Sequence, residues 1–491
     1  MEHEITDLRT AIAFLKTIPG QYAQTDVEAD PICEIHGVYR YIGAGGTVAP
    51  PTKEGPAVVF NKVKGYPGVR SLVGMFASRK RVAALLGETQ ESLAFRLREA
   101  VNQAIPPVLV GAEKAQCQEV VYRAEDPGFD QRKILPVTQS TPDDAGPCIT
   151  MGLCLASDPE TGESDVTVHR MFTLDTPDEL TFNYGSTRHI GMMFEKAEKL
   201  GKPLPISINI GLDPAIYLGA SLEPPTTPYG YNELSVAGAL RGKGVELAPC
   251  LTIQEKCIAN AEFVIEGELQ PGIRVAEDKV KGSGTALPEF PGFQGTAHKE
   301  PIIKVKAITH RKNPIFQSII GSSAEHVCLA GPCMEASILN MAENAIPGFV
   351  HNVYAHPAGG GKFVAILQIH KRKETDEGRQ RQAALLAMST FSELKHIFVV
   401  DDDVDIFSTN DVLWAMTMRY QGDIDTIFIP GTRYHRNDPS ARVAYSPTIR
   451  ADGAGCKMIF DCTVPYGEEE KFKRAQFMEL DPKKFFPDMT I

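Results

Sequence analysis

The stretch IFVVDDDVDIFSTNDVLWAMTMR, residues 397–419, carries the clearest fold signal in the chain. Its apolar start, 397–400, predicts a short buried strand, and Ser408 precedes a run, 409–419, that predicts a helix. A strand followed directly by a helix is typical of an α/β fold. Four aspartates between positions 401 and 405 raise the question of a metal site. Aspartates just beyond a buried strand more simply serve as turn and cap residues, and we favour that interpretation.

The same alternation of strands and helices extends over the C-terminal third of the chain. We predict a long helix that starts near Glu325, strands at 350–355 and 363–369, and a helix at 378–391. These elements follow a change in pattern near 310–325, where we place a domain boundary.

The part of the chain before this boundary is richer in strands. PISINIG (205–211) alternates apolar and polar side chains, and IIKVKAIT (302–309) predicts another strand. Closer to the N-terminus we predict a helix at 6–17, a strand at 56–63, and a helix from Ser78 to Leu86. The sequence therefore predicts a mixed fold of the α/β (α+β) class.

The composition is that of a globular protein with two or three domains. The chain has 491 residues, 43% of them hydrophobic and 23% charged. Its net charge is -12 with scattered lysine and arginine, which argues against nucleic acid or an anionic membrane as a partner. We expect neither a secretory signal nor a membrane span. The ten cysteines, none in C-x-x-C spacing, indicate buried thiols in a reducing compartment, so we predict a cytoplasmic protein.

The glycine cluster IGAGGT (42–47) is a possible nucleotide-binding motif, but it does not match G-x-G-x-x-G in register. We interpret it as a turn at which two backbones approach closely. The sequence has no Walker A, G-x-S-x-G or H-E-x-x-H motif, so it carries no standard hydrolase signature.

The segment DVTVHRM (165–171) places polar groups in an apolar strand. In a flat strand Asp165 and Arg170 face opposite sides, so both can serve one site only if a bulge or the strand end intervenes. The alternative is a half-exposed strand whose Asp and Arg are solvated.

Two further segments, GSTRHIGMMFEKAEKLG (185–201) and YNELSVAGALRG (231–242), place polar groups at predicted helix starts. Ser186 or Thr187 can cap the first helix, which puts Arg188 and His189 in its first turn, a natural phosphate site. His189 is either a metal ligand or a helix-end residue. The helix dipole alone would explain Glu233 in the first turn of the second helix. A Glu, a His and an Asp from three elements could also hold a hard divalent ion beside a phosphate.

Four blocks that span nearly the whole chain resemble one known family. The blocks are FNKVKGYPGVRSLVGMFASRKRVAALLG (60–87), ELSVAGALRG (233–242), VVDDDVDIFSTNDVLWAMTMR (399–419) and CKMIFDCTVP (456–465). In this order they resemble the UbiD-like decarboxylases, which use prenylated flavin mononucleotide (prenylated FMN), and among these the 3,4-dihydroxybenzoate (protocatechuate) decarboxylases.

The resemblance implies four parts of the chain. These are the N-terminal α/β part of the flavin domain (1–115), a split β-barrel that binds prenylated FMN (116–315), a connecting helix (316–345) and a C-terminal α/β oligomerisation domain (346–491). The tail of the last part is expected to return to the cofactor site. Family members are dimers or hexamers, so we expect a homo-oligomer.

The resemblance also implies a metal site and a cofactor site. Asp165, His189 and Glu233 match the ligands of a divalent metal, usually manganese, that binds the cofactor phosphate, often with a potassium ion nearby. The family more often has Asn at the first position, so Asp165 adds a negative charge next to the phosphate. The implied cofactor-binding residues are Thr167, Val168, His169, Arg170, Arg188, His189 and Lys457.

Arg170 matches the active-site arginine of the family, and Glu289 matches its partner carboxylate. The family usually has a second acid five residues after the first, whereas EFPGFQG (289–295) has Gln294 there. An amide cannot donate a proton as a carboxylic acid does, so we assign the acid–base role to Glu289.

Three polar residues in stretches that resemble the catechol-acid decarboxylases are candidates to hold ring hydroxyls: His326, Lys362 and His435. Such hydroxyls need donors and acceptors in a mostly apolar pocket. The alternative for each is a surface or structural polar residue.

The implied reaction is the reversible, non-oxidative decarboxylation of a hydroxylated aromatic acid, 3,4-dihydroxybenzoate to catechol and CO2, through a covalent adduct with prenylated FMN. Direct loss of CO2 would leave an aryl carbanion with no place for its charge, so an electron-sink cofactor is needed. Arg170 would orient the carboxylate, and Glu289 would return a proton to the ring.

The expected partners are a small aromatic acid and a flavin prenyltransferase that supplies the cofactor, with no nucleic acid and no membrane. One alternative is a sibling decarboxylase that acts on 4-hydroxybenzoate, vanillate, gallate or a heteroaromatic acid. A second is a flavin-dependent oxidoreductase, and a third is a scaffold that has lost activity.

Overall fold

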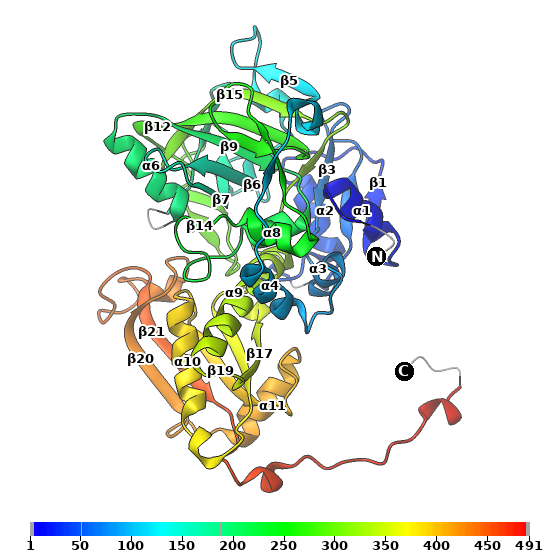
Figure 1. Ribbon diagram of the computed structural model, residues 1–491, viewed down its shortest axis with the longest axis vertical. Helices are drawn as coiled ribbons and strands as arrows, with labels where there is room; N and C mark the ends of the chain where they lie inside the picture. The colour runs from blue at the N-terminus through cyan, green and yellow to red at the C-terminus, as the bar shows by residue number, and fades with distance from the viewer. Residues whose placement is uncertain (1–3, 51, 186–187, 488–491) are drawn as a thin grey trace.

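The structure, a computed structural model, describes residues 4–50, 52–185 and 188–487. It confirms the predicted mixed α/β class. Figure 1 shows that the N-terminal sheets and the C-terminal sheet lie on opposite sides of a long helix, α9 (Ala324–Ala345). In the described part of the chain, no helix is both long and apolar enough to cross a membrane.

The N-terminal region is a four-stranded sheet flanked by helices. The strands, in sheet order, are β1 (Tyr22–Thr25), β2 (Ala57–Phe60), β3 (Arg70–Val73) and β16 (Ile315–Gln317). The helices are α1 (Leu8–Lys16), α2 (Glu34–Gly43), α3 (Arg79–Leu85) and α4 (Leu93–Asn102). As predicted, Ser78 caps α3, because its side chain accepts a hydrogen bond from the Arg81 backbone N–H.

The close backbone approach predicted for the glycine cluster is confirmed. Gly46 has a φ of +65°, and a Cβ atom there would lie 2.4 Å from the carbonyl carbon of Ser323. Only glycine fits this turn, which packs against the start of α9.

A seven-stranded sheet forms the centre of the molecule and carries much of the predicted site. Its order is β5-β15-β12-β9-β6-β7, and β8 pairs with β15. The strands are β5 (Val120–Arg123), β6 (Cys148–Ser157), β7 (Ser164–Phe172), β8 (Glu179–Thr181), β9 (Leu204–Ile210), β12 (Phe263–Ala276) and β15 (Lys299–His310). The predicted strands 205–211 and 302–309 are β9 and β15.

Smaller elements surround this sheet. The strands are β4 (Val108–Leu109), β10 (Glu246–Pro249), β11 (Lys256–Ile258), and the hairpin of β13 (Thr285–Pro288) and β14 (Gln294–Thr296). The helices are α5 (Gln131–Ile134), α6 (His189–Lys199), α7 (Pro214–Gly219) and α8 (Leu234–Arg241).

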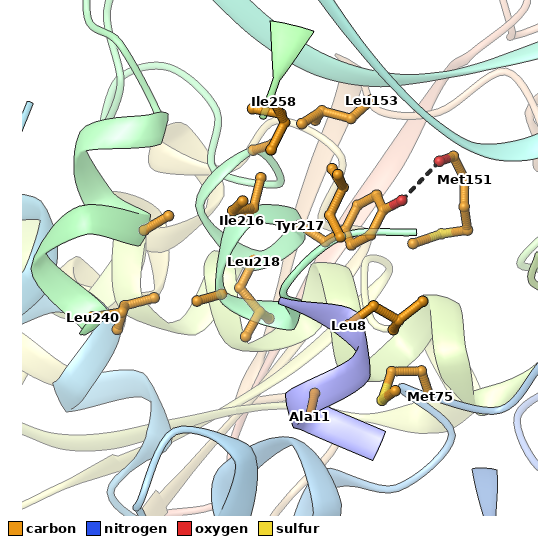
Figure 2. Close-up of a cluster of buried hydrophobic side chains, with 14 of the residues drawn as sticks. Leu8, Ala11, Met75, Met151, Leu153, Ile216, Tyr217, Leu218, Leu240 and Ile258 are labelled. Atoms are coloured by element: carbon orange, nitrogen blue, oxygen red, sulfur yellow. Dashed lines mark hydrogen bonds between the residues drawn. The ribbon is translucent and has the colours of Figure 1, made fainter. Parts of the chain in front are cut away.

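A shared hydrophobic core joins these N-terminal layers, as Figure 2 shows for side chains from α1, α7, α8 and the central sheet. Tyr217 lies fully buried in this core, and its hydroxyl donates a 2.9 Å hydrogen bond to the Met151 carbonyl oxygen. A buried tyrosine whose hydroxyl is satisfied adds apolar contact without an unpaired polar group. The helices are thereby held against the sheet that presents the site.

The C-terminal part is a five-stranded sheet, as predicted for an α/β unit. Its strands, in sheet order, are β17 (Val350–Ala355), β18 (Val364–Ile369), β19 (His396–Asp401), β21 (Ala454–Asp461) and β20 (Thr426–Arg433). The helices are α10 (Arg379–Thr390) and α11 (Thr409–Arg419), and Ser408 caps α11. Beyond the sheet, residues 465–487 run away from the body as an extended arm, red in Figure 1.

Candidate active site

Three buried side chains predicted as metal ligands lie together. Asp165 comes from β7, His189 is the first residue of α6, and Glu233 directly precedes α8. One ligand atom from each lies within 4.8 Å of the others. His189 Nδ1 is 2.8 Å from Asp165 Oδ1, whereas the buried Glu233 Oε2 has no hydrogen-bond partner.

Without a cation nearby, the negative charge of this buried trio is unfavourable. Burial, together with the nearby Asp165 carboxylate, raises the pKa of Glu233 well above its usual value. Two carboxylate oxygens and an imidazole nitrogen form a donor set that suits manganese or a similar divalent ion. The residues of the trio therefore fit the metal site that the sequence predicts.

The predicted helix starts need small corrections. Ser186 and Thr187, the predicted caps, lie outside the described residues. Arg188 is the N-cap residue of α6 rather than part of its first turn, because its backbone is still extended. Glu233 is likewise the N-cap residue of α8, where the Asn232 side chain accepts the Leu234 N–H.

The residues predicted to bind the cofactor adjoin the trio on β7 and α6. The Thr167 hydroxyl donates to Asp165 Oδ2 over 3.1 Å, and Val168 is half-buried on the same strand. His169 Nδ1–H donates to the Asn183 carbonyl oxygen over 2.9 Å, which leaves its buried Nε2 without a partner. Such unpartnered buried atoms are where a ligand's polar groups are expected.

Two further predicted cofactor contacts, Arg188 and Lys457, are basic side chains. Arg188 forms an ion pair with Glu223 over 2.6 Å. Lys457 lies on β21, where its Nζ donates to the Ser392 carbonyl oxygen over 2.7 Å. Burial lowers the pKa of Lys457 to about 8.

Arg170 is held between two carboxylates, of which the sequence predicted one. Glu289, at the start of the β13–β14 turn, contacts Arg170 Nη1 as expected. Glu277 binds the other edge of the guanidinium with two hydrogen bonds of 2.9 Å. Burial opposes the charge of Arg170, but the carboxylates of Glu289 and Glu277 together raise its pKa. The ladder between β6 and β7 shifts register beside Arg170, but the extra residue lies on β6 between Ile149 and Gly152, so the alternation along β7 is not interrupted there. Asp165 and Arg170 lie near opposite ends of β7.

The second acid thus lies before Glu289 in the chain rather than five residues after it. Gln294, at the expected position, donates to Asp144 Oδ1 over 3.0 Å. Glu277 directly follows the long strand β12, and an acid placed there is the one weak local signal that could have found it. Its side chain is fully buried, whereas that of Glu289 is 20% exposed, which leaves Glu289 the more accessible acid.

Glu300 is a further buried acid that sequence reasoning missed. Burial and the nearby Glu277 carboxylate raise its pKa to about 7. Its Oε1 accepts a 2.8 Å hydrogen bond from Asn183 Nδ2. Asn183 therefore links the His169 ring to this acid.

The three residues predicted to hold ring hydroxyls surround Phe290, the neighbour of Glu289. The His326 ring stacks on the Phe290 ring, with centroids 5.0 Å apart and planes 9° apart. The His435 ring meets Phe290 edge-on at 5.0 Å, and Lys362 Nζ lies 5.7 Å from the Phe290 centroid. The structure therefore brings His326, Lys362 and His435 together beside the Arg170–Glu289 pair.

Two acids without any sequence signal complete this cluster. Glu393 lies 2.6 Å from Lys362 Nζ and 3.5 Å from His435 Nε2. Glu223, the partner of Arg188, lies 3.9 Å from Lys362 Nζ. A continuous set of charges therefore joins the N-terminal half of the site to the C-terminal half.

A buried arginine between two acids, and a buried trio that could hold a divalent ion, together form a candidate enzyme active site. Models of the 3-octaprenyl-4-hydroxybenzoate carboxy-lyase (UbiD) family match the chain over nearly its whole length: the N-terminal domain at residues 15–101, the Rift-related domain at 108–324 and the C-terminal domain at 327–462.

Individual relatives agree with these matches. Gallate decarboxylase of Lactiplantibacillus plantarum is 51% identical over 98% of both chains. The apo structure of a 3,4-dihydroxybenzoic acid decarboxylase from Enterobacter cloacae covers 99% of both chains with 55% identity and a TM-score of 0.94. The UbiD-class enzyme HmfF from Pelotomaculum thermopropionicum, solved in complex with FMN, covers 98% of this chain and 100% of its own, with 32% identity and a TM-score of 0.86.

The chain therefore belongs to the UbiD family and is a carboxy-lyase.

Proposed function

We propose that the protein catalyses the reversible, non-oxidative decarboxylation of 3,4-dihydroxybenzoate to catechol and CO2, with prenylated FMN as cofactor. The observation that carries the proposal is the cluster in which Arg170 and Glu289 adjoin Phe290 and three polar side chains: His326, Lys362 and His435. This cluster offers one end for a carboxylate and another for ring hydroxyls. The similarity to 3,4-dihydroxybenzoic acid decarboxylase supports the same substrate.

Each residue has a defined task in this proposal. Arg170, fixed by Glu277, orients the substrate carboxylate through its guanidinium. Glu289 delivers a proton to the ring carbon that CO2 leaves. Prenylated FMN, when bound, supplies through a covalent adduct the electron sink that an aryl carbanion lacks.

Asp165, His189 and Glu233 would hold a divalent metal, with manganese as the proposed ion and potassium nearby. The metal would neutralise the cofactor phosphate and the two buried carboxylates of Asp165 and Glu233 together. Arg188 would add a further positive charge at the start of α6. The flavin-bound structure of the similar enzyme HmfF supports a flavin cofactor for this chain.

Gallate is a second candidate substrate. The specific observation in its favour is the 51% identity to gallate decarboxylase over 98% of both chains. Gallate has the same two adjacent hydroxyls and one more, so the same polar cluster can receive it. We rank it second because the identity to the 3,4-dihydroxybenzoic acid decarboxylase is higher, 55% over 99% of both chains.

We also propose a homo-oligomer that works in the cytoplasm with a flavin prenyltransferase as cofactor donor. The extended arm supports assembly, because Phe477 is 92% exposed and Met478 is 81% exposed on this chain alone. Apolar side chains exposed to this degree mark a surface that packs against a partner. Size-exclusion chromatography with light scattering on the full chain and on a chain ending at residue 465 tests this proposal.

The decisive experiment measures catechol and CO2 from 3,4-dihydroxybenzoate without added nicotinamide, with protein co-expressed with a flavin prenyltransferase. We expect turnover that exceeds the turnover of gallate, 4-hydroxybenzoate and vanillate. Faster turnover of gallate would replace the proposed substrate. Dependence on a nicotinamide or another electron acceptor would favour an oxidoreductase, and absence of any turnover by flavin-loaded protein would contradict the proposal.

A further inference from the structure

A backbone contact fixes which ring nitrogen of His326 donates a hydrogen bond and which accepts one. Its Nδ1 lies 3.2 Å from the Gly360 carbonyl oxygen. A carbonyl oxygen only accepts, so Nδ1 carries the ring proton and Nε2 presents a lone pair. Burial lowers the pKa of His326 to about 3, so the ring stays neutral and Nε2 remains an acceptor.

The His435 ring is the other tautomer, with Nδ1 as acceptor and Nε2 as donor. The Asn437 backbone N–H donates to His435 Nδ1 over 3.1 Å, so Nδ1 holds the lone pair and Nε2 carries the proton. Burial lowers the pKa of this histidine too, which keeps it neutral. The Nε2–H group lies 3.5 Å from Glu393 Oε1, too far for a strong hydrogen bond, and can therefore donate to a ligand.

Lys362 is a second donor, held in place by the same acid. Its Nζ lies 2.6 Å from Glu393 Oε2, and its side chain is only 10% exposed. Burial opposes its charge, but the carboxylates of Glu393 and Glu223 together raise the pKa of Lys362, so it remains an ammonium. An ammonium has three N–H donors, and the short contact to Glu393 uses one of them.

We propose that Glu393 is a positioning residue that holds the donor Lys362 in a cluster with the donor His435 and the acceptor His326, so that the cluster recognises a singly ionised vicinal diol. This inference rests on the proposed function, since it concerns the hydroxyl end of the same site. A catechol monoanion presents one O⁻, which needs donors, and one O–H, which needs an acceptor. The proton lost from the first hydroxyl passes to solvent. Two equivalent donors, or two equivalent acceptors, would not distinguish the hydroxyls in this way.

The surrounding charges are compatible with an added anion. Lys362 and Arg188 are the cations near His435, and the acids near this cluster are Glu393, Glu289 and Glu223. Lys457 is a further cation near Glu393. Because Glu393 shares its carboxylate between Lys362 and His435, an oxyanion can take over part of the pairing with Lys362 without leaving a buried charge alone.

The test uses 4-nitrocatechol, whose visible absorption reports ionisation of its hydroxyl. Flavin-loaded wild-type protein is titrated with this probe over a range of pH, and with 2-methoxy-4-nitrophenol, which lacks the second hydroxyl. We expect the bound 4-nitrocatechol to ionise at a pH at least about one unit lower than in solution. We also expect it to bind at least tenfold more tightly than the methoxy compound.

Three variants locate the effect. We expect Glu393→Gln to lose the tenfold preference and most of the shift in probe ionisation, and Glu393→Asp, which keeps the charge, to retain both in part. Glu377→Gln is the matched control, because Glu377 also pairs with a lysine of the C-terminal part, Lys371, over 2.9 Å. It should behave as the wild type does.

A neutral bound probe, equal affinity for both compounds, or an unaltered Glu393→Gln variant would overturn the inference. Decarboxylation of 3,4-dihydroxybenzoate is measured separately on the same samples. Probe binding as expected without decarboxylation would contradict the proposed function. It would still support the assignment of Lys362 and His435 as donors and of His326 as acceptor. Decarboxylation with a neutral bound probe would support the proposed function and contradict the recognition of an ionised diol.

Discussion

The acidic run at 401–405 and the buried trio of Asp165, His189 and Glu233 differ in how far basic side chains compensate their carboxylates. In the run, Asp401 and Asp403 both bind Arg419, at 2.9 Å and 2.6 Å, and Asp401 also accepts the Val464 backbone N–H. In the trio, Asp165 meets only the His189 ring as a basic partner among the described residues, and the Glu233 carboxylate meets neither lysine nor arginine.

This difference separates carboxylates that the fold pairs with an arginine from a buried carboxylate that has no such partner among the described residues. The acidic run is prominent in the sequence, yet its charges already have partners within the fold, as the turn-and-cap interpretation requires. The trio is scattered in the sequence, and its buried Glu233 Oε2 has no hydrogen-bond partner among the described residues. A buried carboxylate without a cation is unfavourable by itself and is therefore a stronger sign of a site than a dense run of acids.

The largest expected effect comes from Glu289→Gln on the functional side of the comparison. We expect kcat for decarboxylation to fall by about 10²- to 10⁴-fold, because an amide has no acidic proton to deliver. The fold should survive, since Glu277 continues to anchor Arg170. CO2 release by flavin-loaded protein measures the change.

The control for this variant is the double change Glu289→Gln with Gln294→Glu. Gln294 contacts Asp144 rather than Arg170, so an acid at this position should not restore activity. Recovery of turnover in the double variant would show that residue 294 supplies the proton.

Glu233→Gln separates binding from stability. We expect affinity for Mn²⁺ to fall at least about tenfold, measured by calorimetry. The melting temperature of the metal-free chain should stay the same or rise, because burial and the nearby Asp165 already disfavour the charged form of Glu233 there. A metal-free variant that melts well below the wild type would mean that Glu233 is structural and would remove the contrast with the acidic run.

Asp403→Ala tests the other side of the comparison. Arg419 is only 2% exposed at its side chain and would lose two hydrogen bonds, so the free energy of unfolding should fall by about 1–3 kcal/mol. Urea denaturation measures this loss. The kcat for decarboxylation should stay unchanged, and a decrease in kcat at full folding would place the acidic run in the functional site after all.

The last expected effect, that of Asp401→Asn, is a change in the pH dependence of stability. Burial raises the pKa of Asp401 from 3.8 to about 6 in the folded chain, so the folded state binds this proton more tightly than the unfolded state does. The stability from this group is present below pH 4 and is lost as the pH rises through 6. The slope it adds is at most about 1.4 kcal/mol per pH unit. Unfolding of both proteins at pH 4.5 and 6.5 measures it, and identical slopes would exclude Asp401 as the titrating group.

Local sequence patterns predicted most elements because their causes are local. Alternating isoleucines predicted β9, and Ser78 as a cap predicted α3. The run at 397–419 predicted β19 and α11. The strand predicted at 56–63 proved shorter, Ala57–Phe60, because the chain turns after Phe60. Strands as short as β4 carry too few residues for a periodic signal.

The candidate site was predictable only where the family resemblance supplied positions. From the residues alone, Asp165, His189 and Glu233 remained open to structural explanations. Glu277 and Glu393 were missed because their partners lie 107 and 31 residues away in the chain, and no local pattern encodes a contact over such distances. The polarity of His326 and His435 depends on single backbone groups that only a folded chain brings within reach.

The position of α9 in the chain also sets the order in which the site can form during synthesis. The trio of Asp165, His189 and Glu233 precedes α9, as do Arg170 and both of its acids. Lys362, Glu393 and His435 follow α9. Ribosomes add about 5–20 residues per second, and N-terminal domains fold first, so the two halves of the site are separated by on the order of ten seconds. A nascent chain therefore carries the Asp165, His189 and Glu233 trio and the Arg170–Glu289 pair before the C-terminal sheet adds Lys362, Glu393 and His435.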